Sequence, residues 1–344
     1  MSGSAKMICV TGGGGYLGQH IVRALLAKGH RVRATLRDLE RAKHLRGPLV
    51  EGLRASSDQL EFVEADVTLD GPWAHHMSGC DAVIHTASPF PDKPPRDDRK
   101  LIATAETGTT RVLTHAADAG VKRAVVTSSI VAIIASEPQT DSAFHTEADW
   151  TDPDHPRADA YARSKLAAEV AAWGVARARD LDLTVLNPAL IFGPPVSGRG
   201  ATSVGIIDRV LSGKDLALPR VSMPCVDVRD VADAHVRALT SHRAVGERIY
   251  VGGPMTSFLR IADCLREAYP RNKISRTTAP DTMVQAAAKF DPRLSNVLPY
   301  LGHTVDIRSN KAADLLGLSY RDVQRSIQET AAALEDPAPS FQFA

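Results

Sequence analysis

The sequence lacks the features that mark disulfide-rich, membrane-spanning and nucleic-acid-binding proteins. Its 344 residues include only four cysteines, whose wide spacing fits neither a disulfide scaffold nor a CxxC metal site. No apolar run approaches the ~18 residues that a membrane-spanning helix needs. The 41 basic and 40 acidic side chains leave a net charge of +1, which provides no broad basic surface for a nucleic acid.

Signals for export and for metal binding are also missing. Residues 1–6 contain neither the basic start nor the apolar stretch of a secretory signal. His75 and His76 are neighbours that face different ways on a helix, so we interpret both as surface residues. We therefore expect a reduced, cytoplasmic, globular protein with a small-molecule substrate and with no metal, nucleic acid or membrane partner.

The first half of the chain alternates between apolar runs and helical patterns. Strands are predicted at 6–11, 30–36, 60–65, 82–85, 124–128 and 183–187, and helices at 16–28, 97–119 and 157–180. Strands separated by helices of ten or more residues are typical of βαβ units and a parallel sheet. After residue 190 the alternation weakens, and short helices are predicted at 203–212, 228–241, 258–269 and 320–334.

The predicted fold class is therefore α/β, a doubly wound parallel sheet of the Rossmann type with a smaller, mostly helical C-terminal lobe. Residues 1–190 form the dinucleotide-binding domain in this interpretation. Residues 191–334 form the substrate-binding lobe, with some segments returning to the sheet, and residues 335–344 form a poorly ordered tail.

A glycine-rich turn follows the first predicted strand. Gly12, Gly15 and Gly18 have the spacing G-x-x-G-x-x-G and lead into the helix at 16–28. Glycines permit the tight turn, the close approach of a pyrophosphate to the backbone, and the packing of helix on strand. The amide groups and the dipole of a helix N-terminus favour a bound phosphate. The strand–turn–helix context thus favours dinucleotide binding over an ordinary glycine-rich loop.

The end of the second predicted strand indicates which dinucleotide binds. An NAD site usually has an acidic residue there for the ribose 2′-hydroxyl. This strand ends instead at Arg37, and the first acidic residue is Asp38. A guanidinium suits a 2′-phosphate because its planar donors match phosphate oxygens. With Arg41 and Lys43 adding charge nearby, we predict NADP(H) rather than NAD; the alternative is that Arg37 is only a solvated surface residue.

Tyr161 and Lys165 form the main candidate catalytic pair. Their spacing of four residues places them on one face of the helix predicted at 157–180. An ammonium beside a phenol favours the phenolate, which predicts a lowered tyrosine pKa and a role as general acid or base. Residues 127–129 (Thr-Ser-Ser) end the fifth strand, where the carboxyl ends of parallel strands line a ligand crevice. A hydroxyl there can bond a substrate oxygen; the alternative is an ordinary strand-end turn.

These three features, in this order, resemble the short-chain dehydrogenase/reductase superfamily of the extended type. The strings HTASPF at 85–90, VVTSS at 125–129, NPALIFGP at 187–194 and VRATLRD at 32–38 narrow the resemblance. They look like the group of dihydroflavonol reductase, cinnamoyl-CoA reductase and yeast-type methylglyoxal/3-methylbutanal reductase. The resemblance covers residues 6–240 well and is loose after residue 275.

The resemblance implies a role for each matching residue. Ser129 would hold the carbonyl oxygen, Tyr161 would donate the proton as hydride arrives from the nicotinamide, and Lys165 would bind the ribose hydroxyls and lower the tyrosine pKa. The implied cofactor contacts run from the pyrophosphate and the 2′-phosphate to the nicotinamide, and are Gly12, Gly15, Tyr16, Leu17, Gly18, Arg37, Lys43, Asp66, Val67, Thr86, Ala87, Thr127, Pro188 and Ser203.

One string departs from the family pattern. The family often has an asparagine before glycine in the helix that follows the fourth strand, whereas Thr107 stands before Gly108 here. The departure puts a water relay held by that asparagine in doubt. It leaves the serine, tyrosine and lysine in place.

The substrate pocket is predicted from apolar residues that flank the catalytic strand ends. They are Phe90, Ile130, Val131 and Ile191, and Met223, in the loop before the helix predicted at 228–241, would form the far wall. The alternative for each is ordinary core or loop packing. Few charged residues occur in these stretches, which favours an apolar or aromatic carbonyl compound over a sugar nucleotide. Arg199, Arg209 and Arg220 are the cations that keep a diphosphate-binding alternative open.

The function predicted from these residues is NADPH-dependent reduction of an aldehyde or ketone, reversibly the oxidation of an alcohol. Two alternatives on the same scaffold are a sugar-nucleotide epimerase or dehydratase and a 3β-hydroxysteroid dehydrogenase/isomerase. A third, of a different class, is a regulator that senses NADP without turnover, although such proteins commonly lose the tyrosine or lysine. The protein is expected to be a monomer or a homodimer.

Overall fold

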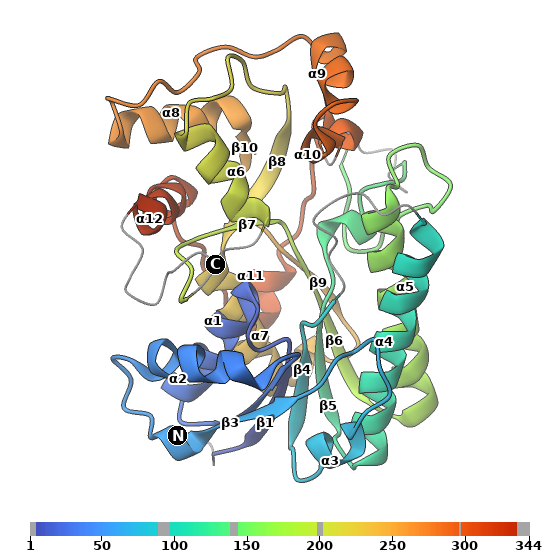
Figure 1. Cartoon of the computed structure of the whole chain (residues 1–344). Coiled ribbons are helices and arrows are strands. Elements are labelled where there is room, and N and C mark those ends of the chain that lie inside the picture. The colour runs from blue at the N-terminus through green and yellow to red at the C-terminus, as the bar shows by residue number, and fades with distance from the viewer. Residues whose placement is uncertain (1–4, 89–96, 138–143, 198–201, 296, 336–344) are drawn as a thin grey trace.

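The computed structural model describes residues 5–88, 97–137, 144–197, 202–295 and 297–335 (Figure 1). Seven parallel strands form the central sheet in the order β3-β2-β1-β4-β5-β6-β9. Their bounds are β1 Met7–Thr11, β2 Arg31–Leu36, β3 Leu60–Glu64, β4 Ala82–His85, β5 Arg123–Thr127, β6 Asp182–Pro188 and β9 Arg248–Val251. The order reverses beside β1, so the crevice between β1 and β4 is the switch point where such sheets bind ligands.

Helices cover both faces of this sheet. Helix α1 (Tyr16–Ala27) packs against α7 (Val228–Thr240), and α7 lies on β5 and β6. On the opposite face α4 (Asp98–Asp118) packs along α5 (Ala160–Arg179), with the short α3 (Trp73–Met77) beside it. Because both faces are covered, the strands are buried as near-continuous apolar runs; all four residues of β4 are buried.

The remaining segments form a smaller lobe above the main sheet in Figure 1. A second sheet of three strands has the order β10-β8-β7. The strands are β7 Leu190–Phe192, β8 Ser222–Asp227 and β10 Met255–Ser257. The helices are α6 Thr202–Leu211, α8 Phe258–Ala268, α9 Asp281–Ala288, α10 Pro292–Ser295 and α12 Val323–Glu335. Helix α11 (Lys311–Leu316) instead packs against α7 and β9 of the main sheet. Helix α12 packs on α6 and α8, and apolar side chains of these helices are buried between them.

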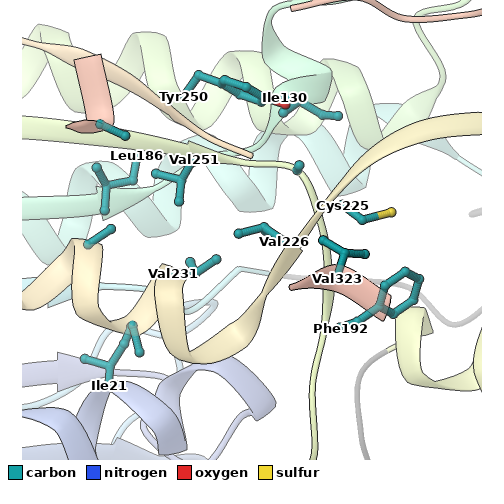
Figure 2. Packing of buried hydrophobic residues seen from close by; sticks show 14 of the residues in the cluster. Ile21, Ile130, Leu186, Phe192, Cys225, Val226, Val231, Tyr250, Val251 and Val323 are labelled. Carbon is teal, nitrogen blue, oxygen red and sulfur yellow. The ribbon is translucent and has the colours of Figure 1, made fainter. Parts of the chain in front are cut away.

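The two parts of the molecule share one hydrophobic core on the α1 and α7 side of the main sheet. In Figure 2, Ile21 of α1 and Val231 of α7 lie below Leu186 and Val251 of the main sheet. The same cluster continues into the lobe through residues such as Phe192, which is fully buried. A separate cluster of buried residues fills the space under α3, α4 and α5.

The predicted α/β doubly wound fold is confirmed, and most elements before residue 190 lie within a few residues of their predicted bounds. The differences lie in the weakly patterned segments. Helix α2 (Ala42–Val50) was not predicted, and it contains Pro48 in its last turn. No strand was predicted after residue 190, but β8 forms there because Ser222–Pro224 pairs with β10. The division into domains at residue 190 stays a prediction, since α7 and β9 pack on or join the main sheet.

The structure also addresses the features missing from the sequence. No helix among the described residues combines the length and the apolar character needed to cross a lipid bilayer. All four cysteines, Cys9, Cys80, Cys225 and Cys264, are buried and unpaired by disulfides. Within the described residues, His, Cys, Asp and Glu form no cluster that would hold a metal ion.

Candidate active site

The glycine turn lies at the switch point of the main sheet. Gly12 has a φ of +69°, and a Cβ added there would lie 3.0 Å from the backbone of Ala87 after β4. A Cβ on Gly18 would overlap the carbonyl oxygen of Gly12. Thr35 of β2 accepts bonds from the turn, at 3.1 Å from the Gly12 amide to its hydroxyl. The turn therefore depends on glycine at two positions, for backbone conformation at one and for close packing at the other.

Helix α1 begins directly after this turn, with Gly15 as its N-terminal cap. The first turn of α1 has no acidic residue, so nothing in it repels an anion. The amide groups of Tyr16, Leu17 and Gly18 belong to the first turn, where helix amides lack partners within the helix. The Tyr16 hydroxyl donates to the carbonyl oxygen of Gly193 at 2.8 Å. Tyr16 thus offers a phosphate its backbone, while its side chain ties α1 to the lobe.

Three basic residues follow β2, and the structure separates their environments. Arg37 is exposed and forms no ion pair among the described residues. Arg41 is exposed and donates from Nη2 to the carbonyl oxygen of Gly14 at 3.2 Å, so its guanidinium lies over the glycine turn. Lys43 is exposed and bonds Glu40 at 2.5 Å, on the surface of α2. Arg37 and Arg41 are therefore better placed for a phosphate than Lys43.

The next predicted contacts lie at the carboxyl ends of β3 and β4. Asp66 and Val67 follow β3 and are half-buried, and the Val67 carbonyl oxygen accepts from Arg111 at 2.6 Å. Thr86 follows β4 and donates its hydroxyl to the Thr11 carbonyl oxygen at 2.9 Å, while Ala87 lies against Gly12. Thr86 and Ala87 therefore border the same crevice as the glycine turn.

Two further predicted contacts are placed differently. Pro188 ends β6 beside β9 and is buried. Ser203 is buried near the start of α6 in the lobe. Among the described residues before α6, Ser197 reaches α1 with its side chain, and its hydroxyl donates to Gln19 at 2.9 Å. Ser197 was not predicted, because no local pattern distinguishes a serine that meets a residue far away in the sequence.

Tyr161 and Lys165 begin helix α5, whose N-terminal cap is Asp159 accepting from the Ala162 amide at 2.7 Å. The two side chains lie one turn apart, with Lys165 Nζ 5.9 Å from the centre of the Tyr161 ring. Ser129 caps a short helical turn after β5 and shares a hydrogen bond with Tyr161. The structure thus brings the serine, the tyrosine and the lysine together at the carboxyl end of β5.

The tyrosine differs from its prediction in one respect. Burial raises the pKa of Tyr161 to about 12, and this outweighs the lowering by the hydrogen bond with Ser129. Lys165 is not among the groups that shift this pKa; its Nζ lies 5.9 Å from the centre of the ring and donates to the Thr127 carbonyl oxygen at 3.4 Å. Burial lowers the pKa of Lys165 itself to about 8, against the opposing charge of Glu169.

Thr127 is held from both sides of the sheet. Its hydroxyl donates to Nε2 of His235 at 2.7 Å, because Nδ1–H of this ring donates to the Val231 carbonyl oxygen at 2.8 Å. Burial lowers the pKa of His235 to about 4, so the ring is neutral and can accept. The Thr127 hydroxyl is therefore engaged on α7, and only its carbonyl faces Lys165.

A family model, the NAD dependent epimerase/dehydratase family, matches residues 8–253 of this chain. The chain belongs to this family. It is 31% identical to cinnamoyl-CoA reductase 1 of Arabidopsis thaliana over an alignment of 339 residues, and this alignment covers 97% of this chain and 91% of the relative. It is 31% identical over 268 residues to tetraketide alpha-pyrone reductase 2 of the same plant, covering 76% and 82%.

Solved structures give the same result. Yeast methylglyoxal/isovaleraldehyde reductase Gre2 complexed with NADPH superposes with a TM-score of 0.78 at 26% identity, covering 95% of this chain and 97% of that one. The resemblance to extended short-chain dehydrogenases/reductases, drawn from a few short strings, is confirmed.

Thr107 stands where the resembling reductases often have an asparagine before glycine, and the structure shows where its side chain lies. Thr107 is exposed on α4 and does not face Lys165. The α4 residue that lines the small cavity behind Lys165 is Thr109, which is 4% exposed. The hydroxyl of Thr109 bonds Nε2 of His85 at 3.2 Å, and His85 Nδ1 bonds the Thr11 hydroxyl at 2.7 Å. Burial lowers the pKa of His85 to about 3, which makes it a neutral linking residue.

The predicted substrate residues divide into three groups. Ile130 and Val131 are 2% and 5% exposed and belong to the core, with Ile130 beside Tyr250 in Figure 2, so packing is their main role. Ile191 of β7 and Met223 of β8 are half-buried at the edge of the lobe. Phe90 lies outside the described residues.

A tyrosine from the loosely matching C-terminal region also approaches the site. Tyr300 is 9% exposed, and burial raises its pKa, with smaller contributions from the charges of Asp159 and Tyr161 nearby. No local signal in the sequence distinguishes Tyr300 from other tyrosines, because its position depends on how the chain returns after α10.

Proposed function

We propose that this protein reduces an aldehyde or ketone with NADPH, with Tyr161 as the proton donor and an apolar or aromatic carbonyl compound as the substrate. The observation that carries this proposal is the meeting of Ser129, Tyr161 and Lys165 at the carboxyl end of β5, beside the glycine turn. The reductase relatives and the NADPH-bound solved neighbour support carbonyl reduction with this cofactor in general.

The residues of the crevice fit a dinucleotide. The close approach of Gly12 to Ala87 and the uncapped amides at the start of α1 leave a surface of backbone for the pyrophosphate. Arg37 and Arg41 would hold the 2′-phosphate, since both are exposed at the end of β2 next to the turn. When bound, NADPH supplies the hydride.

The side chains of this chain supply the proton and the orientation. A Tyr161 phenol with a pKa of about 12 is fully protonated at neutral pH, so it can donate its proton to the carbonyl oxygen. Ser129, already bonded to Tyr161, would hold that oxygen in the same position. Lys165, whose Nζ lies 5.9 Å from the centre of the Tyr161 ring, would bind the ribose hydroxyls of the cofactor.

The character of the lobe favours an apolar substrate over a sugar nucleotide. Two of the cations that left a diphosphate-binding alternative open are already paired with carboxylates. Arg209 bonds Asp215 at 2.6 Å and Asp291 at 2.9 Å, and Arg220 bonds Asp281 at 2.6 Å. Arg199 lies outside the described residues. Half-buried Ile191 and Met223 provide apolar surface near the strand ends.

A panel assay tests the proposal. Purified protein is mixed with NADPH or NADH and with aliphatic aldehydes, aromatic aldehydes, ketones and a thioester, and nicotinamide absorbance is followed. We expect consumption of NADPH with at least one apolar or aromatic carbonyl compound, and much slower consumption of NADH. Tightly bound NAD in the purified protein, together with no NADPH consumption on any carbonyl compound, would favour the epimerase or dehydratase alternative.

A further inference from the structure

A buried carboxylate lies behind the catalytic lysine. Glu169 is on α5 one turn after Lys165, so both side chains project from the same face of the helix. Glu169 is 1% exposed and Lys165 is 7% exposed. Both line one small cavity, which has about 10 Å³ open to the centre of a water molecule, the minimum for a single water. The charge of Glu169 therefore acts on Lys165 across a short and poorly solvated gap.

Three donors hold the Glu169 carboxylate in place. Arg248 of β9 donates Nε–H to Oε1 at 2.5 Å. Ser128 donates its hydroxyl to Oε2 at 2.5 Å, and Asn187 of β6 donates its amide to the same oxygen at 2.9 Å. The carboxylate thus joins α5 to three neighbouring strand ends, and one of these bonds ends at the residue next to Ser129.

The Asn187 amide strengthens the link to the catalytic serine. Besides Glu169, it donates to the carbonyl oxygen of Ser129 at 3.2 Å. The carboxylate therefore orients Ser128 directly and Ser129 through the Asn187 amide. A rotation of the Glu169 side chain would release the hydroxyl of one serine and the backbone support of the other.

The charges around Lys165 show why Glu169 matters for its state. Tyr161 and Glu169 face it from α5, and His85 faces it from β4 as a neutral ring. Beyond Glu169 lies the Arg248 guanidinium, stacked 3.6 Å from the centre of the Trp150 ring. Among the described residues, Glu169 is thus the anion that Lys165 faces, and it lies between this lysine and a second buried cation, Arg248.

We propose that Glu169 is a positioning residue for the reduction. Its carboxylate keeps Lys165 in the ammonium form, and its bonds to Ser128 and Asn187 fix the turn that carries Ser129. This inference rests on the proposed function, because it assigns Glu169 a task within that reaction. Glu169 touches neither substrate nor cofactor in it, and it acts only through its neighbours.

The variant E169Q tests the electrostatic part, because glutamine keeps the shape and removes the charge. At saturating NADPH and carbonyl substrate, the parent rate should fall as pH rises past the Lys165 ionisation. In E169Q this descending limb should move to lower pH by about one unit or more, since a unit charge at this range in a protein interior shifts a pKa by that much. The matched control is E247Q, which removes a surface ion pair with Lys311 near Arg248 and should leave the limb where it is.

A double variant separates the effect of Glu169 on Lys165 from its effect on fold stability through the ion pair with Arg248. Removing one member of a buried ion pair costs far more stability than removing both, so E169Q/R248M should fold even if E169Q does not. If Glu169 acts on Lys165, the descending limb of the pH–rate profile lies at lower pH in the double variant than in the parent, and NADPH affinity is retained. If the double variant returns to the parent limb, or if E169Q never leaves it, the inference is wrong.

A second readout does not depend on activity. The pH dependence of Lys165 acetylation, followed by peptide mass spectrometry, reports the ionisation of this amine in each variant. It should move to lower pH in E169Q and stay in place in E247Q. A parent protein that reduces no carbonyl compound while showing this shift would overturn the proposed function alone, whereas an active parent with unshifted acetylation would overturn the inference alone.

Discussion

The cofactor end and the chemical end of the candidate site differ in the groups that form them: one is mainly backbone, and the other is mainly ionisable side chains. At the cofactor end, the glycine turn presents backbone, and its close contacts leave no room for side chains at Gly12 or Gly18. At the chemical end, the groups are ionisable side chains of α5, with Lys165 and Glu169 buried and Tyr161 half-buried. The first end therefore tolerates little added volume, and the second tolerates little change in charge.

This difference shows how one sheet supports binding and chemistry side by side. Backbone amides at a helix start attract a phosphate without titrating, so the cofactor end should work over a wide pH range. Buried acids and bases respond strongly to pH and to neighbouring charges, so the chemical end should carry the pH dependence. Substitutions at the two ends should accordingly alter different measured quantities.

The largest effect is expected at the chemical end. Tyr161→Phe removes the proton donor but keeps the ring, so the reduction rate should fall by about 10²- to 10⁴-fold, the usual contribution of a general acid. NADPH affinity, measured by nicotinamide fluorescence, should stay near that of the parent because the glycine turn is unchanged. Full activity in this variant would end the mechanism proposed for Tyr161.

At the cofactor end, the strongest effect should come from volume. In Gly18→Ala the new methyl group overlaps the carbonyl oxygen of Gly12, so α1 and the turn must move apart. Overpacking of this kind costs about 3 kcal/mol of unfolding free energy. Denaturant unfolding should register that loss, together with weaker NADPH binding. Gly29→Ala is the matched glycine control for crowding, since no atom lies within 4 Å of a Cβ there, although its φ of +80° carries its own strain.

Much of this contrast could be predicted from the sequence. The turn at 12–18 is a local pattern, and so are the spacing of Tyr161 and Lys165 and the alternation of strands and helices, because each depends on residues close in the chain. These patterns were sufficient to predict the doubly wound sheet, and the family comparison agrees with the resemblance they carry.

The rest depends on contacts between distant segments. Glu169 meets Arg248 across 79 positions of sequence, and Tyr300 reaches Tyr161 only after the chain has passed through the lobe. The strand β8 was missed because its ladder to β10 overrides an unfavourable local composition. The pKa of Tyr161 was predicted in the wrong direction because burial, which a sequence does not reveal, outweighs its hydrogen bond.

One source of pH-dependent stability lies at the chemical end. His235 is fully buried with its pKa lowered from 6.5 to about 4, so the unfolded chain takes up a proton first as pH falls. The stability that this neutral ring contributes is present above pH 6.5 and is lost progressively toward pH 4. Between pH 7 and 5 the loss from one such group is about 2 kcal/mol.

Comparison with His235→Gln isolates that contribution. The glutamine variant should lose about 2 kcal/mol less than the parent over this pH interval, in denaturant melts at each pH. His20 and His85, whose pKa values are about 4 and 3, should keep a common acid sensitivity in both proteins. Equal losses in parent and variant would mean that His235 ionises in the folded protein as it does in the unfolded chain.

The smallest expected effect concerns cofactor choice. Arg37→Ala removes an exposed guanidinium from the end of β2, so NADPH should bind about tenfold more weakly, as expected for one charge-assisted bond to the 2′-phosphate. NADH, which lacks that phosphate, should bind equally well to the parent and the variant. Lys28→Ala is the matched control, because Lys28 is exposed at the C-terminal end of α1, away from the glycine turn, and should change neither affinity. Titrations of all three proteins with both cofactors test this prediction. If the parent binds NADPH and NADH equally, the crevice does not select the 2′-phosphate. Arg37 would then be a solvated surface residue, and charge changes at the cofactor end would have little effect on binding.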